Sequence, residues 1–134
     1  MYQIQSRCEE STDVSEHTEQ ATLIRMCDWN AGRHPELAML YAVPNGSDRH
    51  PAVAGKLKAE GVRKGVPDLC LPVARGGYHG LYVEMKTAKG RTSPQQRDWI
   101  ERLQGEGYRA VVCRGWSAAW DEIASYLGIE GARA

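Results

Sequence analysis

The 134-residue sequence lacks the features of several protein classes. No apolar run is long enough to cross a bilayer, and the stretch MYQIQSRCEESTDVSEH has no basic start followed by an apolar segment. We therefore expect neither a membrane span nor a signal peptide. Internal repeats and low-complexity segments are also absent. These absences, with a length that suits one core, predict a single cytoplasmic domain.

Cysteine pairs at metal-binding spacing are missing as well. The four cysteines form no CxxC motif, and the four histidines supply no short-spaced pair either. Structural zinc sites need such pairs, and chains without an export signal keep their thiols reduced. We therefore expect reduced thiols and no structural zinc. The cysteines are Cys8, Cys27, Cys70 and Cys113.

A net charge is missing too, but the charges are not evenly distributed. Residues 1–48 carry 3 basic and 8 acidic side chains, whereas residues 49–91 carry 9 basic and 3 acidic ones. The remaining residues carry 5 basic and 6 acidic side chains. A local basic excess is what phosphate contacts require, whatever the total charge. An ordinary solvated surface would show the same excess, so charge alone does not decide.

The order of the expected elements defines the fold class. Helical spacing and end signals predict helices over residues 16–30, 50–61, 93–107 and 117–127. Apolar runs predict strands over residues 37–43, 65–73, 81–87 and 108–113, with an Asn-Gly turn after the first. The middle two strands form a hairpin-like pair, and the last two require a parallel, right-handed crossover. We therefore predict an α/β fold with a mixed central β-sheet flanked by helices.

The segment YVEMK, residues 82–86, places two charges in an apolar strand. Because strand side chains alternate, Glu84 and Lys86 share one face. Asp68 begins the preceding strand, near enough along the chain for the two carboxylates to meet. With the backbone carbonyl of Met85, they are hard oxygen ligands that suit Mg²⁺ or Mn²⁺.

These residue types suit hydrolysis of a phosphate ester. A metal-activated water could attack, and Lys86 could orient that water or offset charge on the phosphate. Glu19, on the first helix, could complete the acidic site directly or through water. Glu16, one helical turn earlier, is the alternative for that role, and Glu19 could also be an exposed first-turn residue.

The pattern VPD…YVEMK resembles the signature of PD-(D/E)xK nucleases, with Pro67 and Asp68 followed by Glu84-x-Lys86. The flanking segments narrow the resemblance to the VRR-NUC (virus-type replication-repair nuclease) branch over roughly residues 16–128. These segments are VPNGSDR, KLKAEGVRKGVPDL, GLYVEMKT and SPQQRDWIERLQGEGY. Residues 1–15 are then a polar, flexible N-terminus and residues 129–134 a short tail.

The resemblance implies a restriction-endonuclease-like fold and a role for each motif residue. Asp68, Glu84 and Glu19 match metal-binding positions, Lys86 the catalytic lysine, and Gln96 the glutamine of the following helix. Gln96 also stands at N3 of a capping box whose N-cap is Ser93, which explains it without chemistry. Small members of this branch are typically homodimers, and branched DNA such as four-way junctions is an expected substrate.

Basic residues around the motif are predicted to contact DNA phosphates, although helix and loop solvation would also explain them. They are Lys56, Lys58, Arg63, Lys64, Lys89 and Arg91. The tryptophans fall at helical positions and are predicted to be core residues rather than base-stacking platforms. They are Trp29, Trp99, Trp116 and Trp120.

The sequence therefore predicts a Mg²⁺- or Mn²⁺-dependent DNA nuclease, acting in repair or phage DNA processing in a bacterial or phage-infected cell. A non-catalytic nucleic-acid-binding module with the same fold is the first alternative, and a structural domain is the second. A nuclease acting on flaps, nicks or ends is the third. The acidic pair separates the first alternative from an enzyme, because a pure binder gains nothing from carboxylates opposite phosphates.

Overall fold

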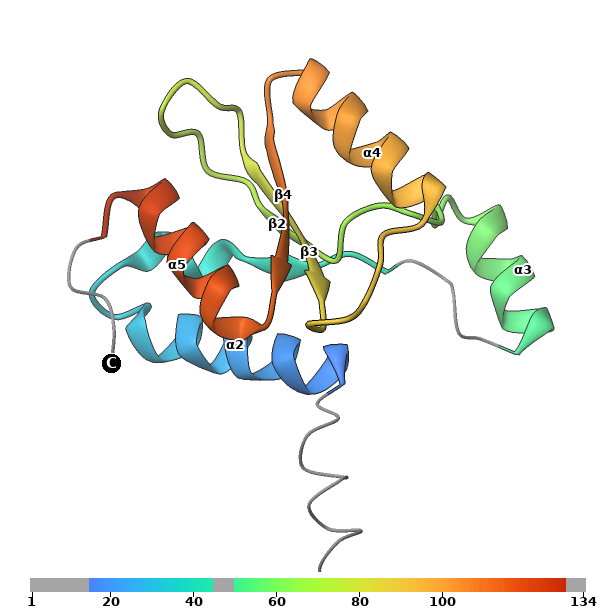
Figure 1. The fold of residues 1–134 in the computed structure, drawn as a ribbon, viewed down its shortest axis with the longest axis horizontal. Helices are drawn as coiled ribbons and strands as arrows, with labels where there is room; N and C mark the ends of the chain where they lie inside the picture. The colour runs from blue at the N-terminus through green and yellow to red at the C-terminus, as the bar shows by residue number, and fades with distance from the viewer. Residues whose placement is uncertain (1–14, 45–49, 130–134) are drawn as a thin grey trace, which may run out of the picture.

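A four-stranded mixed sheet forms the centre of the computed structural model, which describes residues 15–44 and 50–129 (Figure 1). The strands lie in the order β1 (Tyr41–Ala42), β2 (Leu69–Leu71), β3 (Leu81–Lys86) and β4 (Arg109–Arg114). The first two pairings are antiparallel and β3 pairs with β4 in parallel. The predicted hairpin and crossover are therefore both confirmed.

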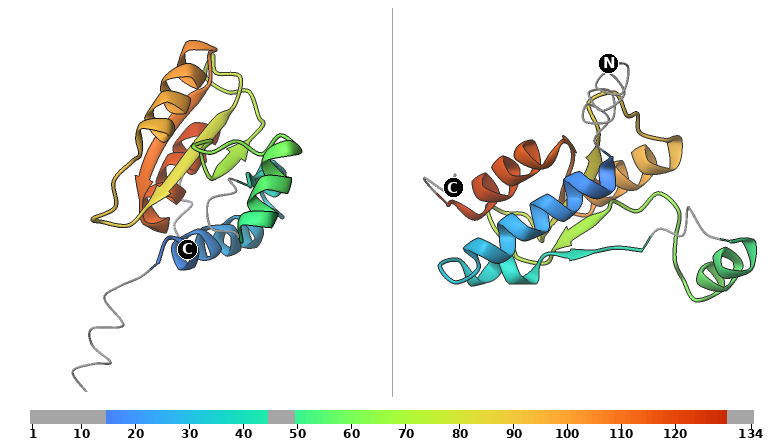
Figure 2. Two further views of the ribbon diagram at one scale, coloured as in Figure 1. Left: turned by 90° about the vertical axis from the view of Figure 1, so that its right-hand side faces the viewer. Right: turned by 90° about the horizontal axis from the view of Figure 1, so that it is seen from below.

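Helices cover both faces of this sheet (Figure 2). On one side, α2 (Glu16–Asn30) and α5 (Trp116–Leu127) pack against each other and against β3. On the other side, α4 (Pro94–Gly105) packs on β4. The short α3 (Pro51–Ala59) lies apart from the sheet, next to the start of α4 (Figure 1), and a 3₁₀ helix, η1 (Pro35–Met39), follows α2.

The main core lies between the sheet and the pair α2 and α5. Leu81, Val83 and Met85 of β3 are fully buried there against Leu23 of α2 and Ile123 of α5. Burying a side chain of this size contributes about 1.5–3 kcal/mol. Strand alternation then directs the even-numbered residues of β3, including Glu84 and Lys86, to the α4 side.

Most predicted elements are confirmed, but the strand over residues 37–43 is wrong in its first half. Pro35 starts a 3₁₀ turn in which the Leu37 N–H donates to the His34 carbonyl, and only Tyr41 and Ala42 pair as a strand. Proline at the first position favours a helical turn, and a single buried leucine is enough to anchor it. The predicted Asn-Gly turn lies outside the described residues, as do residues 1–14 and 130–134.

The tryptophan prediction is wrong at one position. Trp120 is buried and Trp99 and Trp116 are half-buried, but Trp29 at the end of α2 is 85% exposed. Helical spacing alone does not show where a neighbouring element stops covering a helix.

Three cysteines, Cys27, Cys70 and Cys113, are buried free thiols, as predicted. Burial raises the pKa of Cys27 to about 12 and that of Cys113 to about 11, which keeps both thiols protonated and unreactive. Cys8 lies outside the described residues. Within residues 15–44 and 50–129, none of the helices has the length and apolar character that a bilayer crossing needs.

Gly65 is required where the chain passes the first turn of α4. Its φ of +97° disfavours other residues, and an added Cβ would lie 2.8 Å from the Gln95 backbone. Gly61 has a similar φ of +101° but open space around it. We expect Gly61→Ala to cost about 1–2 kcal/mol of unfolding free energy from backbone strain, and Gly65→Ala at least about 1 kcal/mol more from overlap.

Urea denaturation of the two variants measures this difference. Equal losses of stability would contradict a close approach of this segment to α4.

Candidate active site

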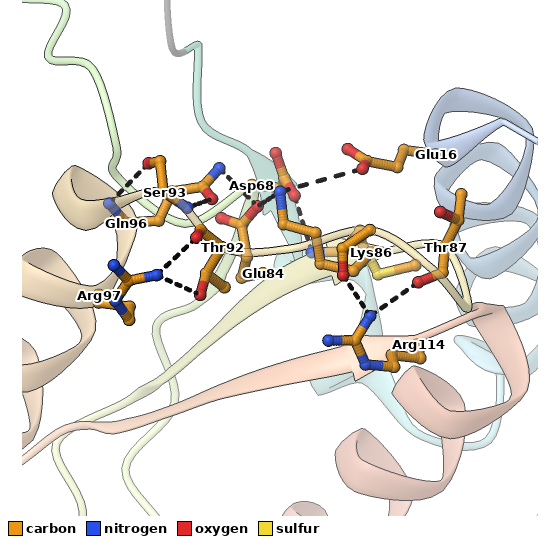
Figure 3. A network of polar contacts seen from close by, with 12 residues as sticks. Glu16, Asp68, Glu84, Lys86, Thr87, Thr92, Ser93, Gln96, Arg97 and Arg114 are labelled. Atoms are coloured by element: carbon orange, nitrogen blue, oxygen red, sulfur yellow. Dashed lines mark hydrogen bonds and ion pairs between the residues drawn. The ribbon is translucent and has the colours of Figure 1, made fainter.

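Glu84 and Lys86 form a buried ion pair at the C-terminal end of β3 (Figure 3). The Lys86 Nζ lies 3.4 Å from the Glu84 Oε2, and the two residues are only 7% and 1% exposed. Burying charges costs several kcal/mol per ion unless partners satisfy them. The partners of this pair therefore define the site.

Asp68 reaches the site because β2 stops pairing at that point. The last β2–β3 pair is Leu69 with Val83, and the same register would place Pro67, which has no N–H, opposite Met85. The Asp68 Oδ2 instead accepts a hydrogen bond of 2.7 Å from the Met85 N–H. The side chain thus replaces a backbone partner, and this contact fixes the carboxylate beside β3.

Gln96 forms the predicted capping box and also contacts Glu84, while a catalytic role for it stays a prediction. Its Oε1 accepts from the Ser93 N–H at 2.8 Å, which completes the capping box of α4. Its Nε2 donates to the Glu84 Oε2 at 3.1 Å. One amide therefore caps the start of α4 and holds the buried carboxylate.

The second oxygen of Glu84 lacks a hydrogen-bond partner within residues 15–44 and 50–129. Its Oε1 is buried, and no described residue forms a hydrogen bond to it. Burial first, and then the nearby Asp68 carboxylate, raise the pKa of Glu84 to about 8, although Lys86 opposes this shift. An unpartnered carboxylate oxygen next to a second carboxylate needs a proton or a cation.

This donor set fits a hard divalent cation. Glu84 Oε1 and the Asp68 carboxylate supply oxygen ligands, and the Met85 carbonyl belongs to the residue whose N–H holds Asp68. No group of three His, Cys, Asp or Glu side chains in the described segments could hold an ion without other ligands. Mg²⁺ commonly uses one or two carboxylates and keeps several waters, so two carboxylates suffice.

The two acidic residues of α2 occupy different places. Glu16 Oε2 lies 3.9 Å from the Lys86 Nζ, whereas Glu19 Oε1 lies 3.0 Å from the position of a Cβ added at Gly115. Gly115 N–H in turn donates to the Lys86 carbonyl at 3.0 Å. Glu16 thus contacts the predicted lysine, while Glu19 lies by the backbone at the same end of β3. A metal-binding role for Glu19 stays a prediction.

The predicted DNA-binding residues form two groups. Lys89 and Arg91 lie in the loop between β3 and α4, which Arg114 holds by donating to the carbonyls of Thr87 and Gly90 (Figure 3). The other four lie on or after α3. The role of Arg114 was missed, because its position opposite Lys86 depends on the parallel register, which the sequence does not display.

Comparisons with known proteins agree on one family. The model of the VRR-NUC domain family matches residues 2–117. A solved structure named "VRR_NUC domain protein" is similar to this chain, with a TM-score of 0.72 and 30% sequence identity, and the match covers 87% of this chain and 90% of that one. No curated protein matches the chain significantly.

The raised pKa of Glu84 predicts that the free energy of unfolding depends on pH. Its pKa is about 8 in the folded protein against an ordinary 4.5, so the folded state retains a proton that the unfolded state loses between these values. Stability of the metal-free protein should therefore fall as pH rises from about 4.5 to about 8, by at most about 1.4 kcal/mol per pH unit. Glu84→Gln should remove this component.

Urea denaturation in EDTA across this range measures the effect. The same pH profile for the parent and Glu84→Gln would show that Glu84 ionises normally.

The two roles of Gln96 can be separated by two variants. Ser93→Ala removes the helix cap and should cost about 1 kcal/mol of stability while leaving Mg²⁺ affinity unchanged. Gln96→Glu keeps the capping box but sets a carboxylate against Glu84. We expect thermal stability below that of the parent, because the buried Glu84 loses its amide donor and faces another carboxylate. We also expect Mg²⁺ affinity to be about 10–100-fold lower.

Calorimetric titration with Mg²⁺ and thermal unfolding give the two readouts. Equal Mg²⁺ affinity for Gln96→Glu and the parent would leave Gln96 with a capping role alone.

Proposed function

Because this chain belongs to the VRR-NUC family, we propose that it is a nuclease that hydrolyses phosphodiester bonds in DNA with Mg²⁺, or Mn²⁺ as a substitute. The observation that supports the proposal most is the unpartnered, buried Glu84 Oε1 beside Asp68. In a protein that only bound nucleic acid, two carboxylates facing phosphates would weaken the binding. This pair therefore favours hydrolysis over binding alone.

The side chains divide the work of the reaction. Asp68 and Glu84, with the Met85 carbonyl, would hold the ion, and Glu19 would support it from α2. When bound, the ion would supply Lewis-acid charge neutralisation and a more acidic water. Lys86, positioned by Glu84 and Glu16, would stabilise negative charge developing on the phosphate. Gln96 would hold Glu84 in place through its amide.

A structure-selective activity on branched DNA, such as four-way junctions, is the finer part of the proposal. Basic residues lie in two separate segments, the loop after β3 and the segment around α3, and could follow more than one strand. A homodimer would supply two sites for paired incisions. The two-residue edge strand β1, with Tyr41 and Met39 each 49% exposed, offers one surface that a second copy could cover.

Cleavage assays test this function. Labelled four-way junctions, flaps, single strands and linear duplexes are incubated with the protein in Mg²⁺, Mn²⁺ or EDTA. We expect metal-dependent cleavage that falls about 10²-fold or more in Lys86→Ala, Asp68→Ala and Glu84→Gln, because each removes a ligand or a charge at the phosphate. The exposed Glu101 of α4 provides a matched control, and Glu101→Gln should cleave normally.

The DNA that is cut fastest identifies the substrate class. Binding of these DNAs without cleavage in either metal would replace the nuclease with a non-catalytic binding module.

A further inference from the structure

A cleft of about 410 Å³ opens between α3 and α4. Three cationic side chains line it, Lys58, Arg63 and Lys64, together with the indole of Trp99. The other lining residues, Ala54, Gly55 and Val62, are small or apolar, so no acidic side chain opposes an anion there. Its volume lies in the range of sites that bind small organic groups, about 300–1,000 Å³.

The wall formed by residues 62–65 is held against α4. Gly65 is buried, and a Cβ at this position would overlap the Gln95 backbone. This close approach fixes the segment that carries Arg63 and Lys64 relative to the helix that carries Trp99. The close approach of the two backbone segments therefore places the cations and the indole around one cleft.

Trp99 differs from the tryptophans that serve the core. Trp120 is 2% exposed in the main core, whereas Trp99 is half-buried and borders the cleft. An aromatic ring next to lysine and arginine is the combination that binds unpaired nucleotides, since the ring stacks on the base and the cations neutralise the phosphate. The sequence predicted a core role for Trp99, and its half-buried ring can serve the cleft as well.

The helix α4 carries both a residue that lines the cleft, Trp99, and a residue of the candidate active site, Gln96. Trp99 follows Gln96 by three residues on α4, a distance of about 4.5 Å along the helix axis. Gln96 donates to Glu84, the central carboxylate of the site. A nucleotide in the cleft would therefore lie within a short length of DNA strand from the phosphate at Asp68 and Glu84.

We propose that the α3–α4 cleft binds an unpaired nucleotide of the DNA strand that is cut, with its base stacked on Trp99 and its phosphate on Lys58, Arg63 and Lys64. The proposal rests on the proposed nuclease function and specifies its substrate, a branched DNA that presents an unpaired nucleotide, or unstacks one on binding, near the scissile phosphate. Fully paired DNA cannot place a base in the cleft without unstacking it, which costs a few kcal/mol.

Binding without cleavage tests this cleft separately from catalysis. A twelve-nucleotide oligothymidylate and an abasic strand of equal length and charge are titrated with the full chain in EDTA, and anisotropy reports the affinity. We expect the parent to bind the oligothymidylate about tenfold more tightly than the abasic strand, because only the former stacks. Trp99→Leu should remove this preference and leave abasic binding unchanged.

Two further variants serve as controls. Trp29→Leu removes an exposed indole on α2 and should leave both affinities unchanged. Lys64→Ala should lower the affinity for both strands by the same factor and reduce the salt dependence of binding, because the Lys64 side chain would contact phosphate rather than base. Circular dichroism verifies folding. If Trp99→Leu does not fold, photocrosslinking of an iododeoxyuridine strand to the parent should modify Trp99.

Equal affinity of the parent for the two strands would overturn the proposal. A Trp99→Leu variant with an equal loss of affinity for both strands, or crosslinks that map to other residues, would overturn it as well. Failure of the cleft and failure of the enzyme remain distinguishable. Cleavage without base-dependent binding would reject only the cleft proposal. Base-dependent binding without cleavage in any metal would reject only the proposed nuclease function.

Discussion

The buried pair of Glu84 and Lys86 constrains much of the surrounding structure. A charge pair that is nearly inaccessible to water is tolerated only where other groups satisfy its remaining donors and acceptors. Two elements supply them, α4 through Gln96 and α2 through Glu16. The start of β2 instead places the Asp68 carboxylate nearby, which disfavours ionisation of Glu84. The cap of α4 and the early end of β2 are ordinary boundaries of secondary structure. Here they also position Gln96 and Asp68 next to the buried pair.

The same constraint connects stability to chemistry. Among the buried side-chain polar atoms of the described residues, only the Glu84 Oε1 lacks a hydrogen-bond partner, and the Asp68 carboxylate lies nearby. A fully satisfied arrangement would be more stable, but it would have no position left for a ligand. Residual electrostatic strain of this kind is typical of functional sites. A proton or, as proposed above, a cation would neutralise this oxygen, and the balance between them would depend on pH.

The sequence predicted the elements whose ends carry strong local signals. The α2 and α4 helices and the β2–β3 hairpin appear where caps, glycines and alternation placed them, and the meeting of Asp68 with Glu84 follows from that hairpin. Local signals did not decide which residue of α2 contacts Lys86, because Glu16 and Glu19 lie only three residues apart on one helix. They also did not show that Trp29 is exposed, since exposure depends on where neighbouring elements end.

The α3 helix illustrates why a neutral chain can still suit a polyanion. It buries none of its residues, and its two lysines lie near its end, so the main core does not require it. The segment that follows α3 contacts the rest of the protein, because Gly65 packs against α4. A helix held in this way contributes little to the free energy of folding and can vary in charge without affecting the sheet. Substrate preference can therefore change in α3 while Asp68, Glu84 and Lys86 stay fixed by the buried network.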